Sequence, residues 1–124
     1  SAIKVRYEGP VSALALAVPT AVEQIIDNFV DNALSIVPPK STLTLRVAKS
    51  ATTVELHVLD QGPGMSAEDC TRAFDRFWRA ASDNKGSGLG LAIVAQLARA
   101  SGAAAELTPR PEGGIDASVR FKAP

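Results

Sequence analysis

The stretch that decides the fold is Thr20–Leu34, with the sequence TAVEQIIDNFVDNAL. Its apolar residues recur at steps of three and four, the spacing of a helix with one wide apolar face. These residues are Val22, Ile25, Ile26, Phe29, Val30, Ala33 and Leu34. Thr20 stands three residues before Glu23, which predicts a capping box at the start of the helix. Pro38 and Pro39 end the helical region, so the sequence predicts one amphipathic helix here.

Strands are predicted on both sides of this helix, from alternating or short β-like runs. The predicted strands are Ile3–Tyr7, Ala13–Val18, Thr42–Val47, Thr53–Leu59, Ala104–Leu107 and Ala117–Phe121. The last two pair as a hairpin across the loop Pro111–Gly114. His57 alternates with apolar neighbours in one of these strands, and we interpret it as a structural residue.

Two further helices follow the strands of the middle of the chain. Ser66 is expected to cap a helix whose apolar side carries Cys70, Ala73, Phe74 and Phe77. A third helix is predicted over residues 89–100, ended by Gly102, and residues 80–87 are predicted to form a mobile loop. Helices and strands mix without a regular βαβ alternation. We therefore predict an α+β sandwich, one mostly antiparallel sheet with helices on one face.

Composition limits the function. The 124 residues suffice for one domain, residues 1–124, and 13 basic residues balance 13 acidic ones. No net field then draws the molecule to nucleic acid or to an anionic membrane. Cys70 is the only cysteine, which excludes an internal disulfide. The longest apolar run, Val11–Val18, is too short for a bilayer span, and we expect a cytoplasmic domain.

Asn28 and Asn32 lie four residues apart, so their amides share one face of the first helix. One interpretation is that both simply face solvent, beside Asp27 and Asp31. The other is a cation site, because amide oxygens are ligands that suit Mg²⁺. The pair alone favours the first interpretation.

Two glycine-rich segments carry the remaining chemistry. Asp60 follows an apolar strand and begins the run Asp-Gln-Gly-Pro-Gly, where a carboxylate can accept a hydrogen bond from an exocyclic amine. Its glycines let a flat ring approach the backbone, although an ordinary turn has the same pattern. The second segment, Gly86–Leu91, opens the third helix and exposes backbone N–H groups to a phosphate. A polar loop precedes it, which argues against a dinucleotide fingerprint.

The order and spacing of the motifs resemble those of histidine kinases. The N box corresponds to Asn28–Ala33 and the first glycine box to Asp60–Gly64. The F box corresponds to Phe74–Arg79 and the second glycine box to Gly86–Leu91. The match covers nearly the whole chain and is similar to the Bergerat-type ATP fold of gyrase B, MutL and the large heat-shock chaperone. The F box is typical of the kinase branch.

The resemblance implies a role for each matching residue in a site for ATP and Mg²⁺. Asn32, helped by Asn28, would hold the metal, and Asp60 would bind the adenine amine. Arg79 would lie near the γ-phosphate. The implied lining of the nucleotide site is completed by Gly62, Gly64, Met65, Phe77, Lys85, Gly86, Gly88, Leu89 and Gly90.

Three positions refine the implied activity. In the related ATPases a glutamate precedes the metal-binding asparagine by four residues and activates water, and here that position is Asn28, which is no general base. Phosphoryl transfer to another acceptor is therefore expected. Ser35 and Ile36 stand where the family has a basic residue and then an aromatic residue or histidine, which predicts weak ATP binding.

The implied partners are a dimerisation domain that carries the phosphoacceptor histidine and a downstream response regulator. No such histidine segment occurs in this sequence. We expect the isolated domain to be monomeric and unable to complete its reaction. Two alternatives stay open: a degenerate nucleotide-binding module without phosphotransfer, and a serine-kinase anti-sigma relative, which the F box argues against.

Overall fold

The computed structural model describes residues 2–75 and 90–124. Its strands are β1 (Lys4–Glu8), β2 (Thr42–Lys49), β3 (Thr53–Leu59), β4 (Ala104–Pro109) and β5 (Ile115–Lys122). Its helices are α1 (Ala21–Leu34), α2 (Ala67–Arg72) and α3 (Gly90–Ala100). None of these helices combines the length and the apolarity that crossing a bilayer requires.

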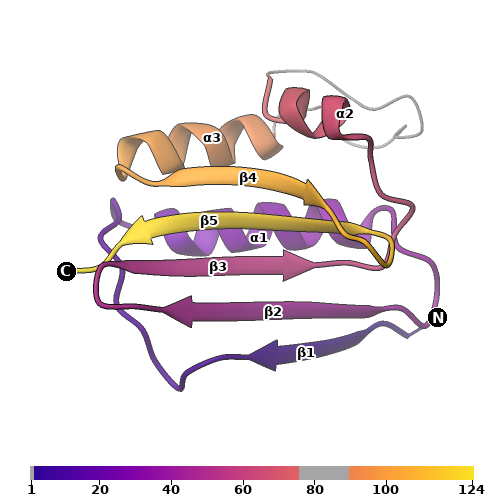
Figure 1. Ribbon diagram of the computed structural model, residues 1–124, viewed down its shortest axis with the longest axis horizontal. Coiled ribbons are helices and arrows are strands. Elements are labelled where there is room, and N and C mark those ends of the chain that lie inside the picture. Colours follow the sequence, from indigo (N-terminus) through magenta and orange to yellow (C-terminus); the bar gives the residue numbers. More distant parts are fainter. Residues whose placement is uncertain (1, 76–89) are drawn as a thin grey trace.

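Within the described residues the strands form one sheet in the order β1-β2-β3-β5-β4 (Figure 1). β1 and β2 run parallel, whereas the other neighbours are antiparallel. α1 lies behind the sheet, and α2 and α3 lie along its β4 side (Figure 1). The predicted α+β sandwich is confirmed, including the mostly antiparallel sheet and the final hairpin.

The core lies between the sheet and the two longer helices. α1 buries Ala21, Ile25, Phe29 and Ala33, the stripe that its apolar periodicity predicts. Phe29 is 1% exposed and packs in one cluster with Val94 of α3 and with core residues of β3 and β5. Burying an aliphatic or aromatic side chain of this size contributes about 1.5–3 kcal/mol each. This packing fixes α1 against the sheet.

Two predictions about the approach to α1 are wrong. Thr20 has a left-handed backbone, with φ of 64°, and makes no side-chain cap bond. In this conformation its hydroxyl instead accepts a hydrogen bond of 2.8 Å from the Gln24 side chain. Residues 13–18 form no strand, because their bonds go to different parts of the chain: Leu16 N donates to Lys122 O of β5, and Val18 N donates to the Ser101 hydroxyl in the turn after α3.

The predicted helix ends are partly confirmed. Ser66 caps α2 by accepting a hydrogen bond of 3.1 Å from Asp69 N, but this helix ends at Arg72. Asp75 N then donates to Arg72 O and closes a turn, so the partly buried Phe74 lies beyond the helix. α3 ends as predicted at Gly102, where Ala103 N donates to Ala98 O, the bond of a Schellman motif.

His57 lies on the sheet face away from the core, between two carboxylates. Its Nδ1 is 2.8 Å from Asp116 Oδ1, and its Nε2 is 3.0 Å from Glu55 Oε1. Leu56 and Val58, its neighbours in β3, point into the core. The structural interpretation of His57 therefore agrees with its place in the sheet.

Candidate nucleotide-binding site

Asn28 meets the first residue of α3. Its side-chain nitrogen donates a hydrogen bond of 2.9 Å to Gln24 O one turn earlier, which turns its Oδ1 away from that turn. A Cβ placed on Gly90 would lie only 2.9 Å from this oxygen. Asn32 is half-buried one turn further along α1. The two helices thus place an amide oxygen beside a helix N-terminus, where backbone N–H groups favour an anion.

Asp60 directly follows β3 and is only 4% exposed. Its Oδ1 accepts hydrogen bonds from Gly62 N at 2.9 Å and from Ile115 N at 3.1 Å. Among residues 2–75 and 90–124, both bonds to the carboxylate end on Oδ1. Oδ2 is therefore the oxygen with which Asp60 can accept a hydrogen bond from a ligand.

The charge of Asp60 is balanced between opposing influences. Burial, the largest influence, raises the pKa of this carboxyl above its ordinary value. The backbone hydrogen bonds from Gly62 and Ile115 act in the opposite direction, as does the positive charge of Arg110. A buried carboxylate without such partners would be costly, so the three contacts support the ionised form.

The glycine turn after Asp60 has little room for side chains. A Cβ on Gly62 would lie 3.3 Å from Asp60 Oδ1 and 3.6 Å from Ile36 Cγ1. Gly64 has φ of 79°, a conformation that favours glycine. Ile36, two turns beyond Asn28 along the chain that leaves α1, thus lies beside the turn. Both contacts are thus made by α1 and the two residues that follow it.

Two residues of the β4–β5 hairpin also meet Asp60, and sequence reasoning missed both. Arg110 Nη1 donates a hydrogen bond of 2.6 Å to Asp60 O. Gly114 has φ of 88°, and a Cβ there would lie 2.1 Å from the same oxygen. The one available signal was the Gly113-Gly114 pair directly before the alternating residues Ile115–Phe121, and we interpreted that pair only as part of a loop.

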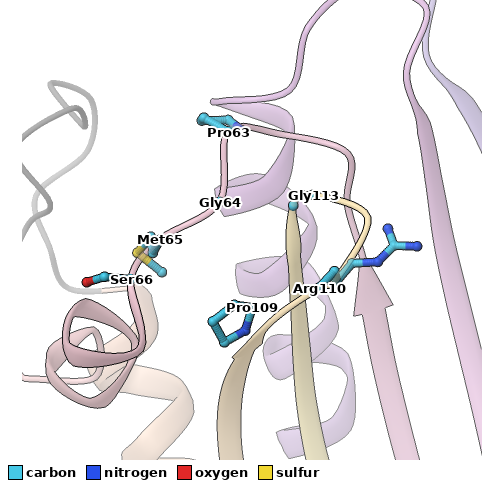
Figure 2. Close-up of a pocket in the computed structure, with 8 residues that line it drawn as sticks. Pro63, Gly64, Met65, Ser66, Pro109, Arg110 and Gly113 are labelled. Atoms are coloured by element: carbon cyan, nitrogen blue, oxygen red, sulfur yellow. The ribbon is translucent and has the colours of Figure 1, made fainter.

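A hollow of about 290 Å³ separates the glycine turn from the hairpin (Figure 2). It is lined by Pro63, Gly64, Met65, Ser66, Pro109, Arg110, Gly113 and Gly114. The Arg110 guanidinium points away from it, toward the chain that follows β3 (Figure 2). Asn28, Asn32 and Asp60 do not line this hollow, so it lies beside the predicted site. Of the predicted residues that the structure describes, Gly64 and Met65 are the two that line it.

The structure brings together part of the predicted site. Asn28 meets Gly90, and Asp60 meets Gly62, while Met65 is partly buried against the core. The predicted contacts that lie outside the described residues are Phe77, Arg79, Lys85, Gly86, Gly88 and Leu89.

Known proteins share this sequence pattern and this fold. The family model of the histidine kinase-, DNA gyrase B-, and HSP90-like ATPases matches residues 17–124. The sensor protein CreC of Escherichia coli K12 is 36% identical over 114 residues, which are 90% of this chain but 24% of CreC. The chain therefore spans about a quarter of this relative.

Solved structures agree. The mycobacterial sensor histidine kinase MprB matches with a TM-score of 0.87 and 25% identity, over 98% of this chain and 82% of that one. Full-length ShkA in complex with AMPPNP matches with a TM-score of 0.79 and 26% identity, over 98% of this chain and 26% of that one. The chain belongs to the histidine kinase-, DNA gyrase B-, and HSP90-like ATPase family, and within it to the ATP-binding domains of sensor histidine kinases.

Proposed function

We propose that this domain binds Mg²⁺–ATP and donates the γ-phosphoryl group to a histidine on a separate dimerisation domain, in a two-component system with a downstream response regulator. The domain positions the nucleotide, and the acceptor histidine comes from outside residues 1–124. As an isolated monomer the domain then lacks the acceptor and does not complete the reaction.

The observation that carries this proposal is the arrangement of contacts along α1. Near Asn28 the helix meets the N-terminus of α3, and two turns later Ile36 lies beside the turn of Asp60 and Gly62. The first contact suits phosphate and a cation, and the second suits a flat base with an exocyclic amine. A nucleoside triphosphate has these two groups at its opposite ends. The ShkA complex with AMPPNP, an ATP analogue, supports the same ligand class.

The donors at the phosphate end fit Mg²⁺. Asn28 presents a neutral amide oxygen, and Asn32 follows one turn later on the same face of α1. Mg²⁺ is usually held by a few protein oxygens together with waters and substrate phosphates. When bound, the ion would neutralise charge on the phosphates. Asn28 and Asn32 would hold it, and their amides orient the phosphates without removing a proton from water.

Kinase chemistry is favoured over hydrolysis by the identity of residue 28. An amide side chain has no basic site at neutral pH, so Asn28 cannot activate a water molecule. What remains for the domain is positioning and charge neutralisation, which are the main contributions of proteins to phosphoryl transfer. The isolated domain should therefore hydrolyse Mg²⁺–ATP and release phosphate slowly.

A degenerate nucleotide-binding module is the second candidate, and the end of α1 favours it. Ser35 donates its hydroxyl to Asn32 O at 2.7 Å, so this position offers a phosphate no positive charge. Ile36 places an aliphatic group beside Gly62 where an aromatic ring could stack on a base. Both features weaken ATP binding, and neither removes Asn28, Asn32 or Asp60.

Calorimetric titration of Mg²⁺–ATP tests the site. Asp60→Ala should lower the affinity at least about tenfold, because a charge-assisted hydrogen bond to the base is lost. Glu106→Ala is the matched control, since it removes an exposed carboxylate on β4. Equal affinities for the wild type and Asp60→Ala would refute the assignment of Asp60 to adenine.

Reconstitution tests the reaction. The domain is mixed with a dimerisation domain that carries its histidine, and radiolabelled ATP is added. Transfer of acid-labile phosphate to that histidine is expected, and Asn32→Ala should abolish it. ATP binding without any transfer would favour the degenerate module.

A further inference from the structure

Arg110 makes a contact that its position in a hairpin loop did not predict. Its Nη1 donates a hydrogen bond of 2.6 Å to the backbone oxygen of Asp60, 50 residues earlier in the chain. The Arg110 side chain is only 20% exposed, and its Nε lies 3.6 Å from Glu112 Oε1. A largely covered guanidinium that bonds a carbonyl is a fixed contact, unlike a solvated surface arginine.

The rest of the hairpin closes on the same residue. Asp60 N donates to Ile115 O at 3.0 Å, and Ile115 N donates to Asp60 Oδ1 at 3.1 Å. Gly114 approaches so closely that a Cβ there would lie 2.1 Å from Asp60 O. Backbone N–H, backbone oxygen and one carboxylate oxygen of Asp60 are thus all bonded by residues of one hairpin.

These contacts have different consequences for the side chain. The bonds to Oδ1 fix one carboxylate oxygen, while the bond from Arg110 fixes the peptide group from which the side chain departs. With both held, the direction of Oδ2 is determined by the hairpin and not by rotation in a solvent-exposed turn. A base-recognising acceptor needs such a fixed direction, because hydrogen bonds weaken steeply away from linear geometry.

We propose that Arg110 is a positioning residue for base selection: by holding the Asp60 carbonyl, it aims Asp60 Oδ2 at the exocyclic amine of adenine. This inference rests on the proposed function. Arg110 itself need not touch the nucleotide, since its guanidinium points to the chain after β3 (Figure 2). The site's preference for adenine is thus determined partly by a residue outside the motifs.

The test compares ATP with inosine triphosphate, whose base carries a carbonyl oxygen where adenine carries the amine. Both are titrated with Mg²⁺ into the 124-residue domain and into Arg110→Gln. The wild type should prefer ATP, and Arg110→Gln should lose about tenfold in ATP affinity with unchanged affinity for inosine triphosphate. Arg120→Gln, which removes an exposed arginine from β5, should keep the wild-type ratio.

A purely structural role would give a different result. Arg110→Gln would then weaken both nucleotides equally or neither, and either outcome overturns the proposal. Urea unfolding of each variant shows whether it is folded. If Arg110→Gln is not folded, Arg110→Lys takes its place, because lysine keeps the positive charge but lacks the planar guanidinium that bonds the Asp60 carbonyl. The ratio of ATP affinity to inosine triphosphate affinity should be lower in Arg110→Lys than in the wild type. An unchanged ratio would overturn the proposal.

The same titrations distinguish failure of the proposed function from failure of the inference about Arg110. A wild type that binds no ATP, or an Asp60→Ala variant with an unchanged preference, would contradict the nucleotide assignment itself. A wild type with a clear preference that depends on Asp60 but not on Arg110 would contradict only this inference.

Discussion

The two ends of the proposed nucleotide site are built in different ways. At the phosphate end, Asn28 and Asn32 come from one helix, and their placement follows from helical spacing. At the base end, Asp60 is held by residues 50 and 55 positions further along the chain. The two asparagines of the phosphate end are therefore close in sequence, although Gly90 of α3 meets them from a distant part of the chain, whereas the base end exists only when β3 and β5 are paired.

The two ends also differ in how freely the atoms at their close contacts can move. At the phosphate end the close contact of Gly90 is with the end of a side chain, Asn28 Oδ1, which can move. At the base end the close contact of Gly114 is with the backbone oxygen of Asp60, which cannot move without the strand. Substitutions should therefore have larger effects at the base end, and the following experiments test that order.

The largest effect is expected for Gly114→Ala. A Cβ at 2.1 Å from Asp60 O, on a backbone with φ of 88°, must displace the hairpin or β3. Strain and overpacking together should lower the free energy of unfolding by about 2–6 kcal/mol. Urea unfolding measures this loss, and ATP affinity should fall with it.

Gly113→Ala provides the matched control. Gly113 has φ of 104°, but a Cβ there would meet nothing within 4 Å. Only backbone strain remains, about 1–3 kcal/mol. If Gly113→Ala were as destabilising as Gly114→Ala, the close approach to Asp60 would not be the cause.

Asp60→Asn should weaken ATP binding by about tenfold to a hundredfold, because an amide nitrogen would face the adenine amine. The ligand-free domain should become more stable at neutral pH. Burial raises the pKa of Asp60 in the folded state above its ordinary value. At pH values between the ordinary and the raised pKa, the folded state therefore binds more protons than the unfolded state. The free energy of unfolding then falls as the pH rises through this range. The Asp60→Asn variant does not lose this stability, because asparagine does not ionise.

Urea unfolding without nucleotide measures the difference. It should vanish at a pH below the ordinary pKa of aspartate, where Asp60 is protonated in both states. A variant less stable than the wild type at neutral pH would mean that the hydrogen bonds to Asp60 outweigh its burial.

ATP affinity of the wild type should also fall as pH is lowered through the raised pKa of Asp60, since the protonated carboxyl loses its charge. The decline should begin at a less acidic pH than for an exposed aspartate. It should begin at a still higher pH in Arg110→Gln, because the charge of Arg110 lowers this pKa. Titration of Asp60→Ala in parallel corrects for protonation of the nucleotide, and identical profiles would refute the prediction.

Gly90→Ala should have a smaller effect at the phosphate end. The new Cβ, 2.9 Å from Asn28 Oδ1, would push that side chain aside. We expect a few-fold loss of ATP affinity in the presence of Mg²⁺. The free energy of unfolding should change little. Alanine is favoured over glycine in a helix by about 1 kcal/mol, and this gain offsets the cost of moving the Asn28 side chain. Loss of folding would show that the contact with Asn28 is rigid.

The smallest effect is expected for Ser35→Lys, which supplies a cation near Asn32. A few-fold gain in ATP affinity should result, and it should shrink at high salt because the charge is partly exposed. Ser35→Ala is the control that removes the hydroxyl bond to Asn32 O without adding charge. An equal gain in both variants would exclude the charge as its cause.

Sequence reasoning succeeded where a pattern is local. The stripe of α1, the end of β3 before Asp60 and the stop at Gly102 follow from spacing and from turn chemistry. It failed at residues 13–18, whose alternation is like that of a strand, because their backbone bonds go to β5 and to the turn after α3. It also missed Arg110, since nothing local distinguishes an arginine that reaches a carbonyl 50 residues away.

The pairing of β3 with β5 also places the base end late in folding. Contacts between residues so far apart in sequence form more slowly than those within a helix, because a long loop must close first. During synthesis, Asp60 leaves the ribosome well before Arg110 and Ile115, the residues that hold it. Until β5 is made, the chain can form α1 with both asparagines, but the proposed base end of the site cannot form. Recognition of adenine would thus require that the chain has been made through β5.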